Sequence, residues 1–97
     1  MAFIQLIEMR TSRFDEVQAL DREWEAATEG KRTLRRSLVT RDRNDPDRYV
    51  FVAFFDSYES AMENSALPET GDFAKRITDL VDGDMTFHDL DVVEDRA

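Results

Sequence analysis

The chain of 97 residues has no cysteine, one histidine and one tryptophan, together with three glycines and two prolines. Without cysteine it can form neither a disulfide nor a zinc–thiolate site, and it offers no thiolate nucleophile. It also lacks any run of about 20 apolar residues, which a membrane-spanning helix requires. Residues 1–10 alternate polar and apolar side chains and lack the apolar stretch of a signal peptide. We therefore expect a cytoplasmic protein that has no membrane partner.

Basic residues are scarce relative to acidic ones. The formal net charge is −9 and the isoelectric point is near 4.5, and residues 49–97 carry all of the excess negative charge. Such a surface repels a phosphate backbone or an anionic lipid surface. The composition therefore excludes nucleic acid as an expected partner.

The signatures of several common sites are absent as well. The sequence contains no phosphate-binding loop, dinucleotide fingerprint, catalytic triad or metal-ligating cluster, so it predicts no metal and no cofactor. It contains no internal repeat, low-complexity tract or linker, and its length suits one domain. We expect residues 1–97 to form a single domain.

Hydrophobic periodicity predicts four strands. Residues 3–9 and 49–55 are apolar on both alternating faces for most of their length, which is typical of central strands in a covered sheet. Residues 34–41 and 87–93 carry charged side chains, which suits edge strands. The turn between the second and third strands is expected at residues 44–47, Asn-Asp-Pro-Asp.

Helices are expected between the strands. Apolar residues recur at three- and four-residue steps from Phe14 to Ala27, and Thr11 or Ser12 supplies a cap before them. Ser57 caps a short helix that runs to Asn64. A further helical stretch is expected over residues 70–82, ending at a glycine.

The resulting order is βαββαβ, the split arrangement of an α+β, ferredoxin-like fold with a four-stranded antiparallel sheet. In this topology the first and third strands lie in the centre of the sheet. These are the two strands that are apolar on both faces, so local pattern and topology agree. Helices cover one face only, and the other would remain a large apolar patch. A second copy of the chain is the simplest cover, so we expect a homodimer.

Three segments carry a resemblance to a known family. They are the opening F-I-Q-L-I-E-M-R-T-S-R-F-D-E-V, the segment F-F-D-S-Y-E-S-A-M-E-N-S and the following D-F-A-K-R-I. Over nearly its whole length the chain resembles the antibiotic biosynthesis monooxygenase-like group of the dimeric α+β barrel superfamily. The resemblance implies that two sheets close face to face into a barrel and that each subunit has a pocket between its sheet and its helices. Members include cofactor-independent oxygenases of polycyclic aromatic phenols, haem-degrading enzymes and quinol oxygenases.

The haem-degrading members use an asparagine, a tryptophan and an axial histidine. The corresponding positions here are Leu6, Asn64 and Ile77, none of which matches. Leucine and isoleucine cannot ligate iron. Haem degradation is therefore not expected, whereas oxygenation of an aromatic compound is compatible with this departure.

Two residues are candidates for catalysis. His88 is the only histidine, and its side chain is the natural proton acceptor near neutral pH, so it could convert a phenol into an electron-rich phenolate. A histidine beside Leu90 and Val92 could equally be a structural residue. Asn64 aligns with a pocket residue of the family, where an amide could orient a carbonyl or an oxygen species. It could also terminate its short helix.

Four residues are candidates for lining the pocket. Trp24 lies on the apolar stripe of the first helix and offers a flat wall for an aromatic ligand, although core packing would use the same position. Tyr49 and Phe51 supply further aromatic surface on the third strand. Gln5 is a polar residue in an apolar strand, and its amide requires a partner, which is a ligand, the backbone or water.

Three interpretations follow. The first is a cofactor-independent monooxygenase that acts on a small aromatic or quinone-like compound, and it predicts an enclosed aromatic pocket with one or two polar groups. The second is a non-catalytic dimeric protein of the same fold that binds a small hydrophobic ligand or a protein. The third is a dimeric scaffold whose cavity is filled by its own side chains.

Overall fold

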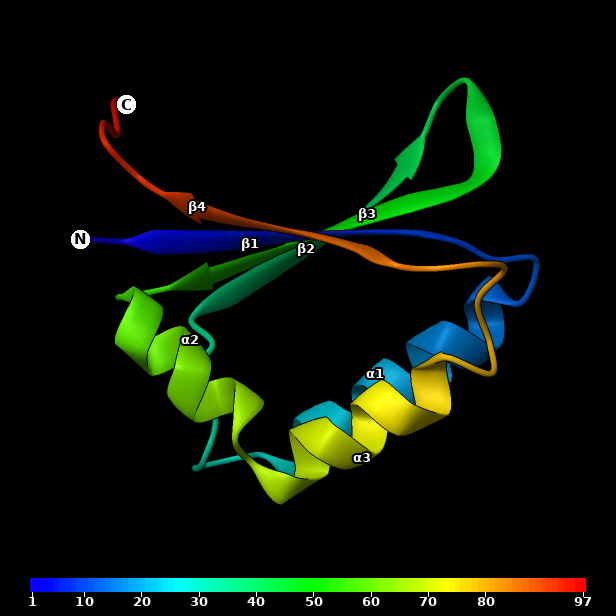
Figure 1. Cartoon of the computed structure of the whole chain (residues 1–97), viewed down its shortest axis with the longest axis horizontal. Helices are drawn as coiled ribbons and strands as arrows, with labels where there is room; N and C mark the ends of the chain where they lie inside the picture. Colours follow the sequence, from blue (N-terminus) through cyan, green and yellow to red (C-terminus); the bar gives the residue numbers. More distant parts are fainter.

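The computed structural model describes residues 1–97 as a sheet with three helices on one of its faces (Figure 1). None of the helices is both long enough and apolar enough to cross a bilayer. The elements in chain order are β1 (Phe3–Arg10), α1 (Phe14–Ala27), β2 (Arg36–Asp42), β3 (Asp45–Phe55), α2 (Tyr58–Ser65), α3 (Pro68–Ile77) and β4 (Thr86–Asp91).

The four strands lie in the order β2-β3-β1-β4, and every neighbouring pair is antiparallel. The expected ferredoxin-like topology is thereby confirmed, with α2 and α3 together filling the place of the second helix. The two strands that are apolar on both faces, β1 and β3, are the central pair, as the sequence pattern predicts.

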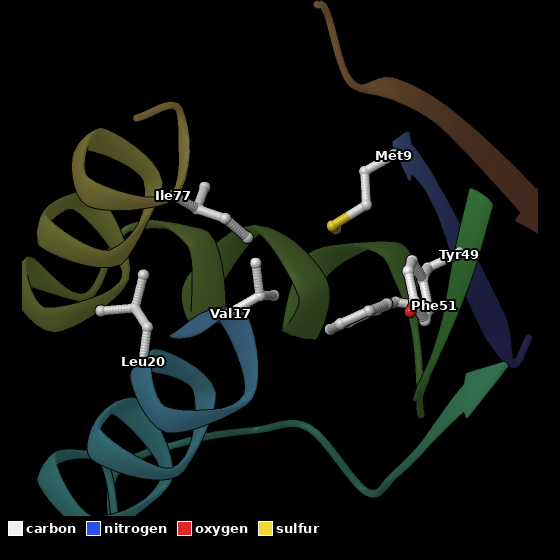
Figure 2. Close-up of a cluster of buried hydrophobic side chains, with 6 residues drawn as sticks. All are labelled: Met9, Val17, Leu20, Tyr49, Phe51 and Ile77. Atoms are coloured by element: carbon white, nitrogen blue, oxygen red, sulfur yellow. The ribbon is translucent and has the colours of Figure 1, made fainter. Parts of the chain in front are cut away.

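Strand register decides which side chains meet the helices. Phe3 pairs with Phe55 and Met9 with Tyr49, and all four side chains are buried against the helical layer. They belong to two separate clusters. The larger one lies where α1 and α3 cross the sheet (Figure 2) and contains Met9, Val17, Leu20, Tyr49, Phe51 and Ile77. The smaller one lies under α2 and contains Phe3, Phe55 and Ala61.

The opposite side of the sheet has no helix on it (Figure 1). Alternation along the strands directs a second set of apolar side chains to this side. We call it the open face; its apolar members are Ile4, Leu6, Leu38, Val50, Val52, Phe54 and Leu90. Leu38 is 38% exposed and Leu90 is 44% exposed. A face of this composition is the patch for which the sequence predicts a partner copy.

The hairpin between β2 and β3 differs from the expectation. The turn consists of Arg43 and Asn44 alone, and the expected turn residues from Asp45 onward already belong to β3. The backbone N–H of Asn44 donates to the Asp42 carboxylate at 2.8 Å, which closes the turn early. Pro46 is tolerated in the strand because it lies beside a bulge in the β2–β3 pairing, where a ladder N–H is dispensable.

The third helix is shorter than predicted and begins earlier. Pro68 occupies its first turn, where the missing N–H costs nothing, and the helix ends at Ile77 and does not reach Asp82. The chain then turns back to the end of β1. The Asp82 N–H donates to the Arg10 carbonyl at 2.7 Å, and the Thr11 hydroxyl donates to the Leu80 carbonyl. These tertiary hydrogen bonds replace the last helical turn.

The two predicted helix caps have different outcomes. Ser57 caps α2 as expected, and it forms a reciprocal pair with Ser60 in which each side chain accepts from the other's backbone N–H at 3.0–3.1 Å. At α1 the cap position is Arg13, and no side chain caps the helix. Thr11 accepts instead from the Arg13 N–H at 2.9 Å, outside the helix, and Ser12 is exposed.

Ser57→Ala should lower the free energy of unfolding by about 1 kcal/mol, because it removes the side-chain acceptor at the start of α2. Ser12→Ala is the matched control and should change it by less than about 0.5 kcal/mol. Urea denaturation followed by circular dichroism measures both. Equal losses in the two variants would contradict the assignment of the caps.

Candidate functional site

A cavity of about 300 Å³ lies between the sheet and the helices. This volume is at the lower end of the range of small-molecule sites. The cavity occupies the space between the two core clusters, with Phe51 of the larger cluster and Phe55 of the smaller one in its wall. Its other lining residues include Gln5 and Ile7 from β1, Trp24 from α1, Val39 from β2, Asn64 from α2, and Thr70 and Phe73 from α3.

Aromatic side chains form much of the wall, and one of them is held in a fixed orientation. The indole N–H of Trp24 donates to the Thr70 hydroxyl at 2.9 Å. The Trp24 ring lies 6.4 Å from the Phe73 ring, between ring centroids. Phe51 faces them from the sheet. Trp24 and Phe51, two of the residues predicted to line a pocket, lie in the wall of this cavity.

Asn64 contributes an amide to the cavity. It lies in the last turn of α2 and is only 7% exposed. Its Oδ1 accepts from the backbone N–H of Thr33 at 3.1 Å, and this donor fixes which way the amide points, since an N–H requires an oxygen acceptor. The Nδ2 group donates to no protein atom, so it is available to a ligand. Asn64 thus ties the segment before β2 to α2 and also presents a donor.

Gln5 also lines the cavity, and its amide nitrogen already makes one hydrogen bond. It donates to the Asp89 carboxylate on the neighbouring strand β4 at 3.0 Å. The partner is therefore a side chain of this chain, and not a ligand, the backbone or water as the sequence suggested. The second N–H of the amide and its oxygen make no hydrogen bond within the chain.

Tyr49 and His88 lie elsewhere. Tyr49 is 6% exposed in the larger core cluster, where its ring stacks on that of Phe14 with centroids 4.1 Å apart. His88 pairs with Leu6 across β1 and β4, and that register places both on the open face, away from the cavity. The structure therefore does not bring Tyr49 to the pocket wall. Nor does it bring His88 into reach of a cavity ligand.

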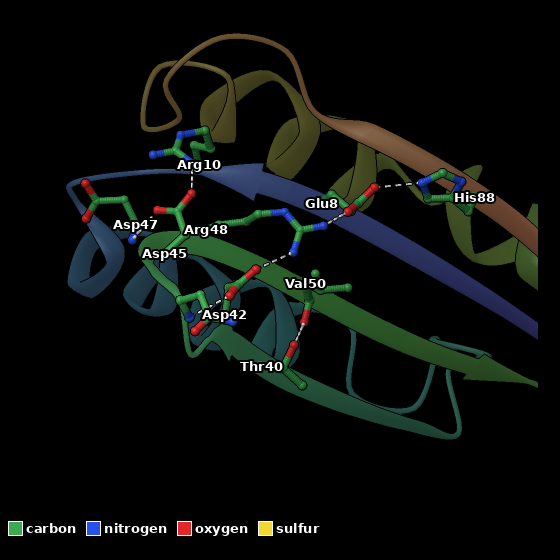
Figure 3. A network of polar contacts seen from close by, with 10 residues as sticks. Glu8, Arg10, Thr40, Asp42, Asp45, Asp47, Arg48, Val50 and His88 are labelled. Carbon is green, nitrogen blue, oxygen red and sulfur yellow. Dashed lines mark hydrogen bonds and ion pairs between the residues drawn. The ribbon is translucent and has the colours of Figure 1, made fainter.

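His88 instead ends a row of charged side chains that crosses all four strands of the open face (Figure 3). Its Nε2 lies 2.7 Å from Oε2 of Glu8 on β1. Glu8 is also paired with Arg48 on β3, and Arg48 reaches Asp42 on β2 at 3.0 Å. No group of three or more histidine, aspartate or glutamate side chains is placed to hold a metal ion. The row is a structural ion-pair network at one end of the apolar patch.

One residue of the cavity was not singled out from the sequence. Asp21 of α1 lines the cavity and is partly buried, and its carboxylate takes part in no hydrogen bond or ion pair. Burial raises the pKa of Asp21, the nearby Glu25 carboxylate raises it further, and Arg22 opposes this. The sequence does contain a sign of this residue's position, namely its spacing. Asp21 lies four residues after Val17 and three before Trp24, which puts an acid on the apolar stripe of the helix.

Basic side chains surround the cavity on the side of β2. Arg32 and Arg35 line it there, whereas the guanidinium of Arg36 lies over the Phe54 ring on the open face, 5.5 Å from its centroid. Arg35 is paired with Asp56 at 2.6 Å, and Arg32 donates to the Glu25 carbonyl at 2.7 Å. The cavity therefore combines apolar walls with a positive rim, a free amide donor and an unpaired carboxylate.

The comparisons with known proteins support the fold. No protein-family model matches the chain, and no curated protein matches it. Solved structures do match. A mutant of SnoaB, a cofactor-independent oxygenase from Streptomyces nogalater, superimposes with a TM-score of 0.82 at 13% identity, covering 97% of this chain and 95% of that one. Rv0793 from Mycobacterium tuberculosis gives 0.82 at 10% identity and covers 100% of both chains.

A third match is a structure from Chloroflexus aurantiacus that is provisionally described as an antibiotic biosynthesis monooxygenase. It gives a TM-score of 0.76 at 20% identity, covering 100% of this chain and 98% of that one. At these identities the likeness establishes the fold. The resemblance to antibiotic biosynthesis monooxygenase-like proteins that the sequence suggested is thus confirmed at the level of the fold.

Asn64→Ala should lower the free energy of unfolding by about 1–2 kcal/mol, because the Thr33 N–H loses its acceptor. Asn64→Asp keeps an acceptor oxygen and should lose less. Ser65→Ala, at the neighbouring exposed position, is the control and should be near neutral. The measurement is urea denaturation. If the three variants are equally stable, the Asn64–Thr33 contact does not hold the segment before β2.

Proposed function

We propose that the cavity binds a small planar aromatic compound bearing a hydroxyl or carbonyl group, and that the protein oxidises this compound with molecular oxygen without a cofactor. The observation that carries the proposal is the cavity itself. Four aromatic side chains, Trp24, Phe51, Phe55 and Phe73, contribute to its wall, together with polar side chains such as Asn64. Aromatic walls favour a flat aromatic ligand, and isolated polar groups orient it.

The proposed oxidation requires no cofactor, because the substrate itself supplies the electrons. An aromatic compound with an acidic C–H or O–H becomes electron-rich when it loses that proton, and the anion can reduce oxygen by one electron. Recombination of the two radicals and return of the proton give a hydroperoxide. Loss of water from a hydroperoxide at a CH₂ centre leaves a carbonyl. One oxygen atom enters the product, the other leaves as water, and the carbon supplies the electrons.

The cavity residues suit two parts of this sequence. The free Nδ2 of Asn64 can donate to the oxygen atom on which the negative charge develops. The apolar walls exclude water from the reacting anion, which strengthens such a hydrogen bond. The fold is also that of SnoaB, a cofactor-independent oxygenase, and this likeness supports the same reaction class.

We further propose that the protein is a homodimer that pairs through the open face. The exposed apolar side chains of this face would be covered by the same face of a second copy, as a two-fold arrangement allows. The row from His88 to Asp42 lies at the end of the patch and would help to fix the register of the two sheets.

Purified protein without added metal or flavin should consume oxygen with at least one member of a panel of hydroxylated naphthalenes, anthracenes and quinols. Trp24→Ala should lower kcat/KM by about tenfold or more, because it removes an aromatic wall of the cavity. Phe87→Ala, an exposed aromatic position on β4, is the control and should retain activity. Binding of panel compounds without any oxygen uptake would leave the alternative, a small-ligand-binding protein without chemistry.

Leu6→Arg should convert a dimer into a monomer, because it puts a charge in the middle of the open face, where pairing would bury it. Ala26→Arg, on the exposed side of α1, is the control and should leave the dimer intact. Size-exclusion chromatography with light scattering gives the mass of each. A wild-type protein that is monomeric at high concentration would contradict the proposed assembly.

A further inference from the structure

The carboxylate of Asp21 is unlike the other carboxylates whose pKa is shifted in this chain. Four other carboxylates have a pKa below the usual range, because each is hydrogen-bonded to a cationic side chain. The pairs are Glu16 with Arg13, Glu23 with Arg76, Asp45 with Arg10, and Glu69 with Lys31. Asp21 has no such partner and is displaced in the opposite direction, with burial as the largest cause. It is the acid of this group that lies in the cavity wall.

The position of Asp21 lowers the stability of the folded chain. An unpaired carboxylate on the buried stripe of an amphipathic helix destabilises the folded chain, and an uncharged residue there would fold better. The neighbouring stripe positions follow that rule: Val17 and Leu20 are buried and apolar, and Thr28 bonds the Trp24 carbonyl of its own helix. Strained or destabilising features of this kind concentrate at functional sites.

We propose that Asp21 is the general base of the cavity, which removes the proton from the O–H or C–H group of the aromatic substrate. This inference rests on the proposed function. The Asp21 carboxylate takes the proton from the O–H or C–H group, and the bond's electron pair stays on the substrate as an anion. Molecular oxygen is then the electron acceptor, and the protonated Asp21 returns its proton to the peroxide oxygen.

Asp21 meets the chemical requirements of this role. It lies on the cavity wall with no other group competing for its oxygen atoms. A carboxylate whose pKa is raised by burial is a stronger base than an exposed one. Asn64, from α2, lines the same cavity and offers its Nδ2 to the anion that forms. The base and the oxyanion donor thus come from two different helices.

Several charged groups lie near Asp21. From its own helix these are Glu25 and Arg22, which shift its pKa in opposite directions. The segment before β2 contributes Arg32 and Arg35 to the cavity wall, whereas the guanidinium of Arg36 lies over the Phe54 ring on the open face. The sheet and the other two helices contribute the uncharged Gln5, Asn64 and Thr70, with Asp89 held by Gln5.

The test uses Asp21→Asn, with Asp15→Asn as the matched control at an exposed position of the same helix outside the cavity. Isothermal titration calorimetry under argon compares 2-naphthol with 2-methoxynaphthalene, which cannot donate a hydrogen bond. The wild type and the control should prefer the naphthol by about tenfold, because its O–H donates to the carboxylate. Asp21→Asn should lose this preference but still bind the methyl ether.

Oxygen uptake gives the second readout. Asp21→Asn should lower kcat by about 100-fold or more, whereas Asp15→Asn should stay close to the wild type. In the wild type kcat/KM should fall as the pH is lowered through the pKa of Asp21, because the protonated acid cannot accept a proton. This acidic limb should be absent in the residual activity of Asp21→Asn.

Stability measurements show whether the variant folds. A pKa raised in the folded state means that Asp21 stabilises the fold below its unfolded value, near 3.8, and that this contribution is lost as the pH rises through the folded pKa. At pH 7 Asp21→Asn should therefore be at least as stable as the wild type in urea. The gain should vanish near pH 3.

The outcomes separate the two proposals. Wild-type oxygen uptake with full activity and an unchanged naphthol preference in Asp21→Asn would overturn the role of Asp21 and leave the oxygenase function standing. A wild type that binds neither naphthalene compound would overturn both. Loss of the preference together with loss of activity, in a variant that remains folded, is the result expected here.

Discussion

The whole structure depends on one constraint, which is that β1 and β3 are apolar on both of their faces. A sheet with two such strands at its centre must be covered twice. The helices cover one side, where Phe3, Met9, Tyr49 and Phe55 are buried. Nothing in the chain covers the other side (Figure 1). The apolar pattern of these two strands thus accounts both for the helical layer on one face and for the proposed dimer on the other.

The cavity arises because the helices cover the sheet in two separate groups. α1 and α3 pack on one end of the sheet and build the larger core cluster, whereas α2 packs on the other end and builds the smaller one. Between the clusters the helices cover the sheet without filling the space, and the aromatic side chains of Trp24, Phe51, Phe55 and Phe73 are part of the wall there. A cavity of about 300 Å³ disfavours a scaffold filled by its own side chains.

The sequence predicted the topology and central strands well, because period-two apolar patterns over whole strands are strong signals. It predicted the turn and the end of α3 poorly, since a local hydrogen bond from Asn44 to the Asp42 side chain and a tertiary one from Asp82 to Arg10 decide those boundaries. It also predicted a pocket containing Tyr49 and left the direction of His88 open. Both depend on pairing register and on where the two clusters meet, which a single sequence does not specify.

We propose that an aromatic ligand binds between the sheet and the helices, and not on the open face. A ¹⁵N NMR titration with 2-naphthol under argon distinguishes the two positions. We expect shifts of the Trp24 indole N–H and the Asn64 side-chain amide, with the His88 backbone amide unmoved. Shifts centred on His88 and Leu6, with Trp24 unaffected, would contradict it.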